Sequence, residues 1–209
     1  MPANYDKIAK VYDFISRIIF QNALVDAQVW LLKYVPANSR ILIVGGGTGW
    51  ILEKFAAVHS NGLTIDYVES SAQMIALSQK RNYQENKINF INQAVENYST
   101  NEKYDIILTP FLFDNFTATK IQIIFTQLDG LLKPGATWLY ADFVYDKEKG
   151  RLWQKALLKL MYFFFRITSK IETQELVSMD TFFNAAGYNK MDATAHFFNF
   201  IKSIVYRKR

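Results

Sequence analysis

Cysteine is absent from this chain of 209 residues, and histidine occurs only twice, at His59 and His196. Without cysteine there can be no disulfide, no cysteine metal site and no thiol catalysis. Two histidines argue against a multi-histidine metal site, so we expect no metal. Long uncharged apolar runs are also missing, since none reaches the roughly 18 residues that span a membrane. The first residues lack the charged-then-apolar pattern of a signal sequence. These absences predict a soluble, cytoplasmic protein.

The composition that is present indicates one globular domain. Half of the residues are hydrophobic and 16% are aromatic. A chain of this length suffices for a single full-sized core. The net charge of +5 is modest and favours acidic partners only weakly.

The rest of the chain is organised around a glycine-rich stretch. Residues 41–44, Ile-Leu-Ile-Val, predict a short buried strand, and residues 50–58 have a helical pattern. Between them lie Gly45, Gly46, Gly47 and Gly49. A strand, a glycine loop and a helix begin a nucleotide-type βαβ unit. The glycines let backbone approach a ligand closely, and the start of the helix favours a carboxylate or a phosphate.

The spacing of these glycines narrows the ligand class. A dinucleotide fingerprint would need a third spaced glycine where Trp50 stands, and no lysine follows to make a P-loop. Glu69 ends the second predicted strand, 20 positions after Gly49. Related folds place an acid at that separation, where it accepts hydrogen bonds from ribose hydroxyls. The alternatives are a purely structural turn and a solvated acid.

Strands and helices alternate through most of the chain. Further strands are predicted over residues 63–68, 88–92, 104–109, 136–143, 188–194 and 200–206, and further helices over 72–81, 117–132 and 173–186. One or two helices precede the first strand. This order implies an α/β fold, a Rossmann-like, doubly wound, mostly parallel seven-stranded sheet with right-handed crossovers. A C-terminal antiparallel strand would close the sheet.

Together these features resemble the class I S-adenosylmethionine-dependent methyltransferases of the small-molecule type. The resemblance rests on the spacing Gly45-x-Gly47-x-Gly49, on Glu69, on the loop at residues 109–115 and on the Leu-Lys-Pro-Gly turn at 132–135. The opening at residues 5–13, Tyr-Asp-x-x-Ala-x-x-Tyr-Asp, adds to it. It implies S-adenosylmethionine as the cofactor. It also implies a single domain over 1–209, with a helical cap (1–38), a cofactor-binding core (39–145) and a lid or crossover helix with closing strands (146–209).

The resemblance also assigns residues to two sites. The implied contacts of the cofactor are Gly45, Gly46, Gly47, Gly49, Glu69, Ser70, Gln93, Ala94, Thr109 and Pro110. The implied contacts of a small, partly apolar acceptor are Tyr5, Tyr12, Phe111 and Phe113. Residues 5–13 could equally form a helix that only caps the sheet.

Two departures from the family's pattern leave a second function open. The family often has an acid where Ile43 stands, and a Gly-Asp pair where Gln93 and Ala94 stand. Each loss removes a charge-assisted contact worth about 1.5–3 kcal/mol, although Gln93 or nearby backbone could substitute. The alternative is therefore a non-catalytic binding module on the methyltransferase fold, with a degraded cofactor site.

No catalytic residue is fixed by the resemblance. Asp114 is the one carboxylate in the loop after the fourth strand, and it could act as a general base or cap the following helix. His196 could serve as an acid or base if the sixth strand runs parallel to the others, because its end would then face the ligand. Otherwise His196 is a surface residue.

The segment 151–170 contains five bases and no acid. Arg151, Lys155, Lys159, Arg166 and Lys170 fall near one helical stripe. Three interpretations remain open: a crossover helix with a solvated face, a lid over an apolar substrate, or a helix lying weakly on an anionic membrane surface. No nucleic-acid partner is expected, because the loop after the fourth strand lacks an Asn/Asp-Pro-Pro-Tyr/Phe signature. The acceptor, the methylated atom and the oligomeric state are not predicted.

Overall fold

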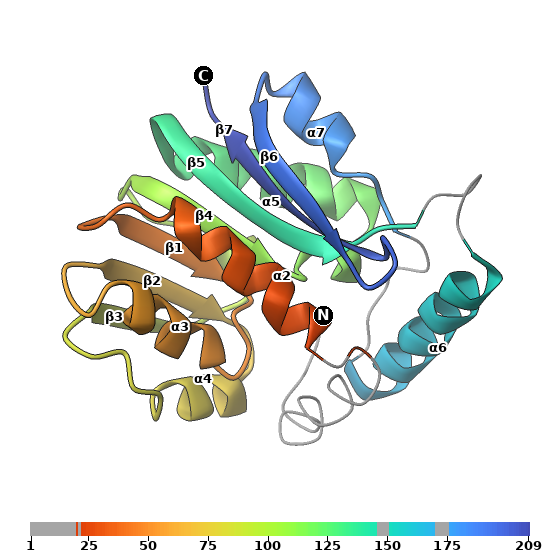
Figure 1. Ribbon diagram of the computed structural model, residues 1–209, viewed down its shortest axis with the longest axis horizontal. Helices are drawn as coiled ribbons and strands as arrows, with labels where there is room; N and C mark the ends of the chain where they lie inside the picture. The colour runs from red at the N-terminus through yellow and green to blue at the C-terminus, as the bar shows by residue number, and fades with distance from the viewer. Residues whose placement is uncertain (1–19, 21, 146–150, 170–175) are drawn as a thin grey trace.

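A computed structural model describes residues 20, 22–145, 151–169 and 176–209. These residues form a seven-stranded sheet with helices on both faces (Figure 1). The strands are β1 (Arg40–Val44), β2 (Thr64–Glu69), β3 (Lys87–Asn92), β4 (Tyr104–Pro110), β5 (Leu132–Phe143), β6 (Asn189–His196) and β7 (Ile201–Arg207). The helices are α2 (Ala23–Leu31), α3 (Trp50–Val58), α4 (Ala72–Ser78), α5 (Ala118–Leu131), α6 (Leu152–Ser169) and α7 (Asp180–Ala185), with short 3-10 helices η1 (Leu32–Tyr34), η2 (Val95–Asn97) and η3 (Phe113–Asn115).

The strand order is β3-β2-β1-β4-β5-β7-β6. Strands β1 to β5 pair in parallel. Strand β7 is antiparallel to both of its neighbours, so β6 runs in the same direction as β5. This arrangement confirms the predicted doubly wound, mostly parallel sheet with one antiparallel strand near its end.

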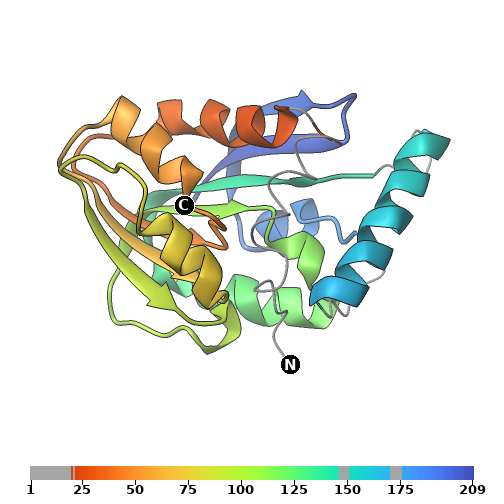
Figure 2. The same cartoon turned by 90° about the horizontal axis from the view of Figure 1, so that it is seen from below.

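Burial on both faces explains the continuous apolar run of the first strand. Ile41 and Ile43 point into one core, whereas Leu42 and Val44 point into the other. Strands buried on both faces read as near-continuous apolar runs because neither face meets water. The first core lies beneath α2, α3 and α4, and the second lies beneath α5 and α7 (Figures 1 and 2).

Three element boundaries differ by three residues or more from those predicted. Helix α4 ends at Ser78 rather than at residue 81, because residues 80 and 81 bond three positions back and form a tighter turn. Strand β5 begins at Leu132, which pairs with Tyr104 before the register shifts, so the Leu-Lys-Pro-Gly turn becomes an irregularity inside the strand. Helix α7 occupies only residues 180–185 of the helix predicted over 173–186, and residues 173–175 lie outside the described residues.

Helix α6 lies beyond the carboxyl ends of the parallel strands, away from the helices that cover the sheet (Figures 1 and 2). Among the described helices, none is long and apolar enough to cross a membrane. The opening segment, with Tyr5 and Tyr12, lies outside the described residues.

Candidate functional site

The glycine loop joins β1 to α3 at the carboxyl edge of the sheet. The N–H of Gly45 donates to the carbonyl of Val68 on β2 (2.9 Å), which ties the loop to the neighbouring strand. Gly49 caps α3 with φ 77°, and a Cβ at this position would lie 2.3 Å from the Cβ of Ser78. Gly49 therefore allows α3 and α4 to pack closely, as well as the left-handed turn.

Glu69 connects the end of β2 to this loop. Its carboxylate accepts the N–H of Gly47 (3.2 Å) on one oxygen and the N–H of Ser71 (2.9 Å) on the other. The side chain is 6% exposed, and this burial raises the pKa of Glu69 despite the donors around it. Glu69 and the glycine loop thus form one structural unit, in which the carboxylate is hydrogen-bonded to the loop backbone.

Tyr67 belongs to the same unit, and sequence reasoning missed it. Its hydroxyl donates to the carbonyl of Gly47 (3.0 Å), and a Cβ on Gly46 would lie 2.5 Å from its ring. Tyr67 precedes Glu69 by two residues on a strand, so both side chains leave the same face. This two-residue spacing from Glu69 is the feature of the sequence that could have indicated Tyr67.

Ser70, Gln93 and Ala94 lie beside Glu69. The hydroxyl of exposed Ser70 donates to the Glu69 carboxylate (3.3 Å). The backbone N–H of Gln93 donates to the carbonyl of Glu69 (3.1 Å), while its side-chain amide donates to the carbonyl of Asn97 (2.7 Å). Ala94 is partly buried and precedes η2. The ends of β2 and β3 therefore meet, as the sequence predicts.

The loop after β4 divides its residues between the two faces of the sheet. Thr109 is fully buried, and its hydroxyl accepts the indole N–H of Trp138 (2.9 Å). Pro110, beside it, is also buried. Phe113 is 2% exposed and lies in the core beneath α5, with its ring 6.3 Å from that of Trp138. The side chains of Thr109 and Phe113 thus serve the second core in this structure.

Phe111 turns to the other face. Its φ is 51°, and its ring lies 5.1 Å from that of Phe143 at the end of β5. Phe143 in turn lies 5.4 Å from Phe200 and 5.2 Å from Phe20. Of the two acceptor-site phenylalanines suggested by the sequence, Phe111 alone joins this aromatic cluster at the carboxyl edge of the sheet.

Two aspartates meet under the same loop. Asp142, at the end of β5 and 1% exposed, accepts the N–H groups of Phe113 (3.1 Å) and Phe143 (2.8 Å). Burial nevertheless raises the pKa of Asp142 to about 7. Burial also raises the pKa of partly exposed Asp114, and repulsion from Asp142 raises it further. Both carboxyl groups of this pair therefore have pKa values above the ordinary range.

His196 lies far from the glycine loop, although β6 runs parallel as the sequence condition required. Its strand, β6, is four strands away from β1 in the sheet. At about 4.8 Å between neighbouring strands, β1 and β6 are roughly 19 Å apart. Its Nε2 lies 3.2 Å from the hydroxyl of Ser203, beneath α2. Burial lowers the pKa of His196. The structure thus does not bring His196 together with the other candidates.

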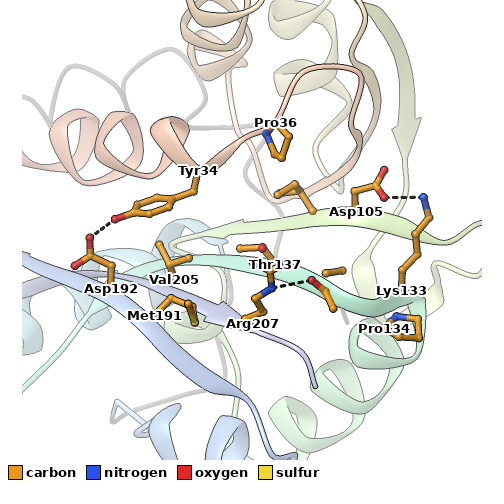
Figure 3. A pocket seen from close by; sticks show the side chains of 13 residues that line it. Tyr34, Pro36, Asp105, Lys133, Pro134, Thr137, Met191, Asp192, Val205 and Arg207 are labelled. Atoms are coloured by element: carbon orange, nitrogen blue, oxygen red, sulfur yellow. Dashed lines mark hydrogen bonds and ion pairs between the residues drawn. The ribbon is translucent and has the colours of Figure 1, made fainter.

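A cavity of about 440 Å³ lies at the opposite edge of the sheet (Figure 3). Its charged groups are already paired, since Lys133 bonds Asp105 (2.7 Å), Tyr34 bonds Asp192, and Arg207 donates to the carbonyl of Gly135 (3.1 Å). Ligands of open parallel sheets bind at the carboxyl ends of the strands. The residues described include no group of three or more side chains that could hold a metal.

Comparison with known proteins decides the family. A family model described as a methyltransferase domain matches residues 41–135. Malonyl-acyl-carrier protein O-methyltransferase 2 of Ilyobacter polytropus is 32% identical over 146 residues, 68% of this chain and 53% of that protein. The chain belongs to the class I S-adenosylmethionine-dependent methyltransferases. Malonyl-acyl-carrier protein O-methyltransferase 1 of the same organism is 29% identical over 143 residues. This methyltransferase-family chain spans about half the length of these two relatives.

Solved methyltransferases share the fold at low identity. The N-methyltransferase NodS of Bradyrhizobium japonicum, solved with S-adenosyl-L-homocysteine, has a TM-score of 0.64 at 13% identity, over 88% of this chain and 83% of that one. A 1,6-didemethyltoxoflavin N1-methyltransferase of Burkholderia thailandensis has a TM-score of 0.66 at 15% identity, over 97% and 85%. At these identities the likeness shows the methyltransferase fold alone.

Proposed function

We propose that this chain is an S-adenosylmethionine-dependent methyltransferase that acts on a small, partly apolar acceptor. The observation that carries the proposal is the bridge between Glu69 and Gly47, which places a buried carboxylate over the backbone of the glycine loop at the carboxyl edge of the sheet. Ligands of such folds bind at this edge. The family membership and the glycine spacing support the same conclusion.

The residues present fit the cofactor at its ribose end. The Glu69 carboxylate has four lone-pair sites, of which donors from Gly47, Ser70 and Ser71 occupy three. The ribose hydroxyl groups could donate to the remaining site, or could take the place of Ser70 as a donor. Gly45 and Gly47 have no side chain, so the methionine end of the cofactor could approach their backbone closely. Ser70, Gln93 and Ala94 lie where the adenine of the cofactor is expected. When bound, S-adenosylmethionine supplies a methyl group on a positively charged sulfur.

One acidic partner that the family often provides for the methionine end of the cofactor is missing from this chain. Ile43 is fully buried in the core, so this position offers only packing. This departure, together with Ala94, favours the alternative of a non-catalytic module with weak cofactor binding. The two functions differ in one measurable respect, which is turnover with any acceptor.

The aromatic cluster at the carboxyl edge supports an apolar acceptor. The rings of Phe111, Phe143 and Phe200 are linked by separations of 5.1 and 5.4 Å. Aromatic side chains provide apolar contact area for a ligand and exclude water, which favours transfer of a group from a charged donor. The chain itself would contribute the alignment of the acceptor with the methyl group and an apolar surface that excludes water.

The aspartate pair supports an acceptor that must lose a proton. Asp114 is partly exposed in the loop next to Phe111, whereas Asp142 behind it is buried and held by backbone N–H groups. In the charged state Asp114 could accept a proton from a hydroxyl or an amine. A carboxylate acceptor, as the names of the two malonyl relatives indicate for them, would need no such base.

Release of S-adenosylhomocysteine with a panel of acceptors tests the proposal. The panel would contain malonyl-acyl-carrier protein, phenols and aromatic amines, with Glu69→Gln and Asp114→Asn as variants. We expect turnover with a hydroxyl or amine acceptor, and we expect Asp114→Asn to lower kcat about 100-fold or more. Turnover with malonyl-acyl-carrier protein alone would assign a carboxylate acceptor. No turnover despite cofactor binding would support the non-catalytic module.

A further inference from the structure

Helix α6 and the β6–β7 turn together expose several apolar and basic side chains. The apolar members are Leu152 (86% exposed), Phe198 (66%), Leu160 (58%) and Trp153 (37%). The basic members are Arg151, Lys155 and Lys159, all exposed. We name these seven residues the aromatic-basic patch. Exposed apolar side chains that gather in one place mark interaction surfaces, whereas single ones are ordinary.

Ring contacts join the two segments of the patch. The ring of Trp153 lies 5.8 Å from that of Phe198, and the guanidinium of Arg151 lies 5.6 Å from the same ring. The amide of Gln154 donates to the carbonyl of Phe198 (3.1 Å). Phe198 is therefore held in its exposed position by α6.

The turn that presents Phe198 has an unfavourable backbone. Phe197, Phe198 and Asn199 all have positive φ, at 46°, 56° and 65°. Such conformations are uncommon for residues other than glycine, and they persist only where the surroundings impose them. Contacts to α6 hold this turn from outside, and Phe198 is directed outward, with 66% of its surface exposed.

The charge of the patch identifies the kind of surface that would cover it. Helix α6 contains no aspartate or glutamate. Leu152, Lys155, Lys159 and Leu160 are spaced by three, four and one residues, which places them along one side of a helix. Helices with bases beside exposed leucine and aromatic side chains lie in the interface of anionic bilayers.

We propose that the aromatic-basic patch docks this protein on an anionic lipid surface. A bilayer accepts projecting leucine, tryptophan and phenylalanine tips without a matching groove, and its negative headgroups attract the lysines between them. The patch also adjoins the aromatic cluster of the acceptor site, because Trp153 lies 6.1 Å from Phe200 and 5.8 Å from Phe197. If the proposed function holds, an apolar acceptor dissolved in lipid would be methylated at the membrane.

Sedimentation with vesicles tests the docking. The vesicles would be phosphatidylcholine alone, or phosphatidylcholine with phosphatidylglycerol at three to one. We expect binding to the anionic vesicles, weakened about tenfold or more by Lys155→Glu with Lys159→Glu and lowered by Leu160→Ser. Matched controls are Lys54→Glu with Lys87→Glu, which are exposed elsewhere, and Ile123→Ser, which is 60% exposed on α5. The controls should bind like the unaltered protein.

A second measurement locates the contact. Brominated lipids should quench tryptophan fluorescence in the unaltered protein, and Trp153→Phe should abolish most of that quenching. Absence of binding to anionic vesicles, or equal binding by patch and control variants, would overturn the docking proposal. Binding to a soluble acidic protein through the same lysines, without vesicle binding, would assign the patch to a protein partner. Titration of each variant with S-adenosylhomocysteine separates this failure from a failure of the proposed function.

Discussion

The Glu69 carboxylate accepts the backbone N–H of Gly47 at 3.2 Å, so the end of β2 and the glycine loop after β1 are one structural unit. Tyr67 adds a second link, since its hydroxyl donates to the carbonyl of the same glycine. Both groups of Gly47 are thus bound by β2, on a strand that is itself buried. These two hydrogen bonds fix the backbone of Gly47 relative to the end of β2.

Gly49 is predicted to be needed for folding, whereas Gly130 is not. Alanine at position 49 would adopt φ 77° with its Cβ 2.6 Å from the backbone Cα of Ser78, which should cost about 2 kcal/mol or more of unfolding free energy. Gly130 lies in α5 with nothing within 4 Å of an added Cβ, so Gly130→Ala should stabilise by about 0.5–1 kcal/mol. Denaturant unfolding of both variants checks the pair. Equal effects would show that the contact between Gly49 and Ser78 is not tight.

Asp142 should make the protein less stable as pH rises. Burial raises its pKa from the ordinary 3.8 to about 7, so between these values the folded state binds more protons than the unfolded state. Its contribution is therefore full below about pH 4 and falls as pH rises toward 7, by up to about 4 kcal/mol. Unfolding free energies at pH 5, 6, 7 and 8 measure this slope. Asp142→Asn should reduce the dependence of unfolding free energy on pH, whereas Glu85→Gln, on an exposed residue, should not. Identical slopes in all three proteins would refute the contribution of Asp142.

Phe111 and Phe113 should separate activity from stability. Phe113 is 2% exposed in the core beneath α5, so Phe113→Ala should cost about 3–5 kcal/mol of unfolding free energy. Phe111 is partly buried in the aromatic cluster, so Phe111→Ala should lower kcat/KM for an apolar acceptor roughly 5- to 30-fold, the effect of about 1–2 kcal/mol. Thermal unfolding and acceptor kinetics on both variants compare the two effects. A reversed pattern would place the acceptor on the other face of the loop.

The parts of the site that could be predicted from sequence are those fixed by local pattern. Ile41–Val44 and the glycines specify a strand and a turn, and parallel strands end at the same edge. The proximity of Glu69 to Gly47 follows from these two facts. The parallel direction of the first five strands was also predictable, because alternating βα units leave few topologies.

The rest depended on backbone geometry that the sequence does not mark. Phe111 has φ 51° without being glycine or asparagine, and in this turn Phe111 and Phe113 pack against opposite faces of the sheet. The sequence does not mark the pairing of Asp142 with Asp114, because this pairing requires the loop after β4 to fold back over β5. The distance of His196 from the loop required knowledge of where β7 inserts.

The measurement that tests the central claim most directly is calorimetric titration with S-adenosylhomocysteine and S-adenosylmethionine. The unaltered protein should bind both, and Glu69→Gln should weaken binding roughly 10- to 100-fold, because a charged acceptor is lost at the ribose. Glu85→Gln, on an exposed glutamate away from the loop, should bind normally, and circular dichroism would verify that all three proteins are folded. No heat at millimolar ligand, or equal affinity in the Glu69 variant, would contradict the assignment of this loop as the cofactor site.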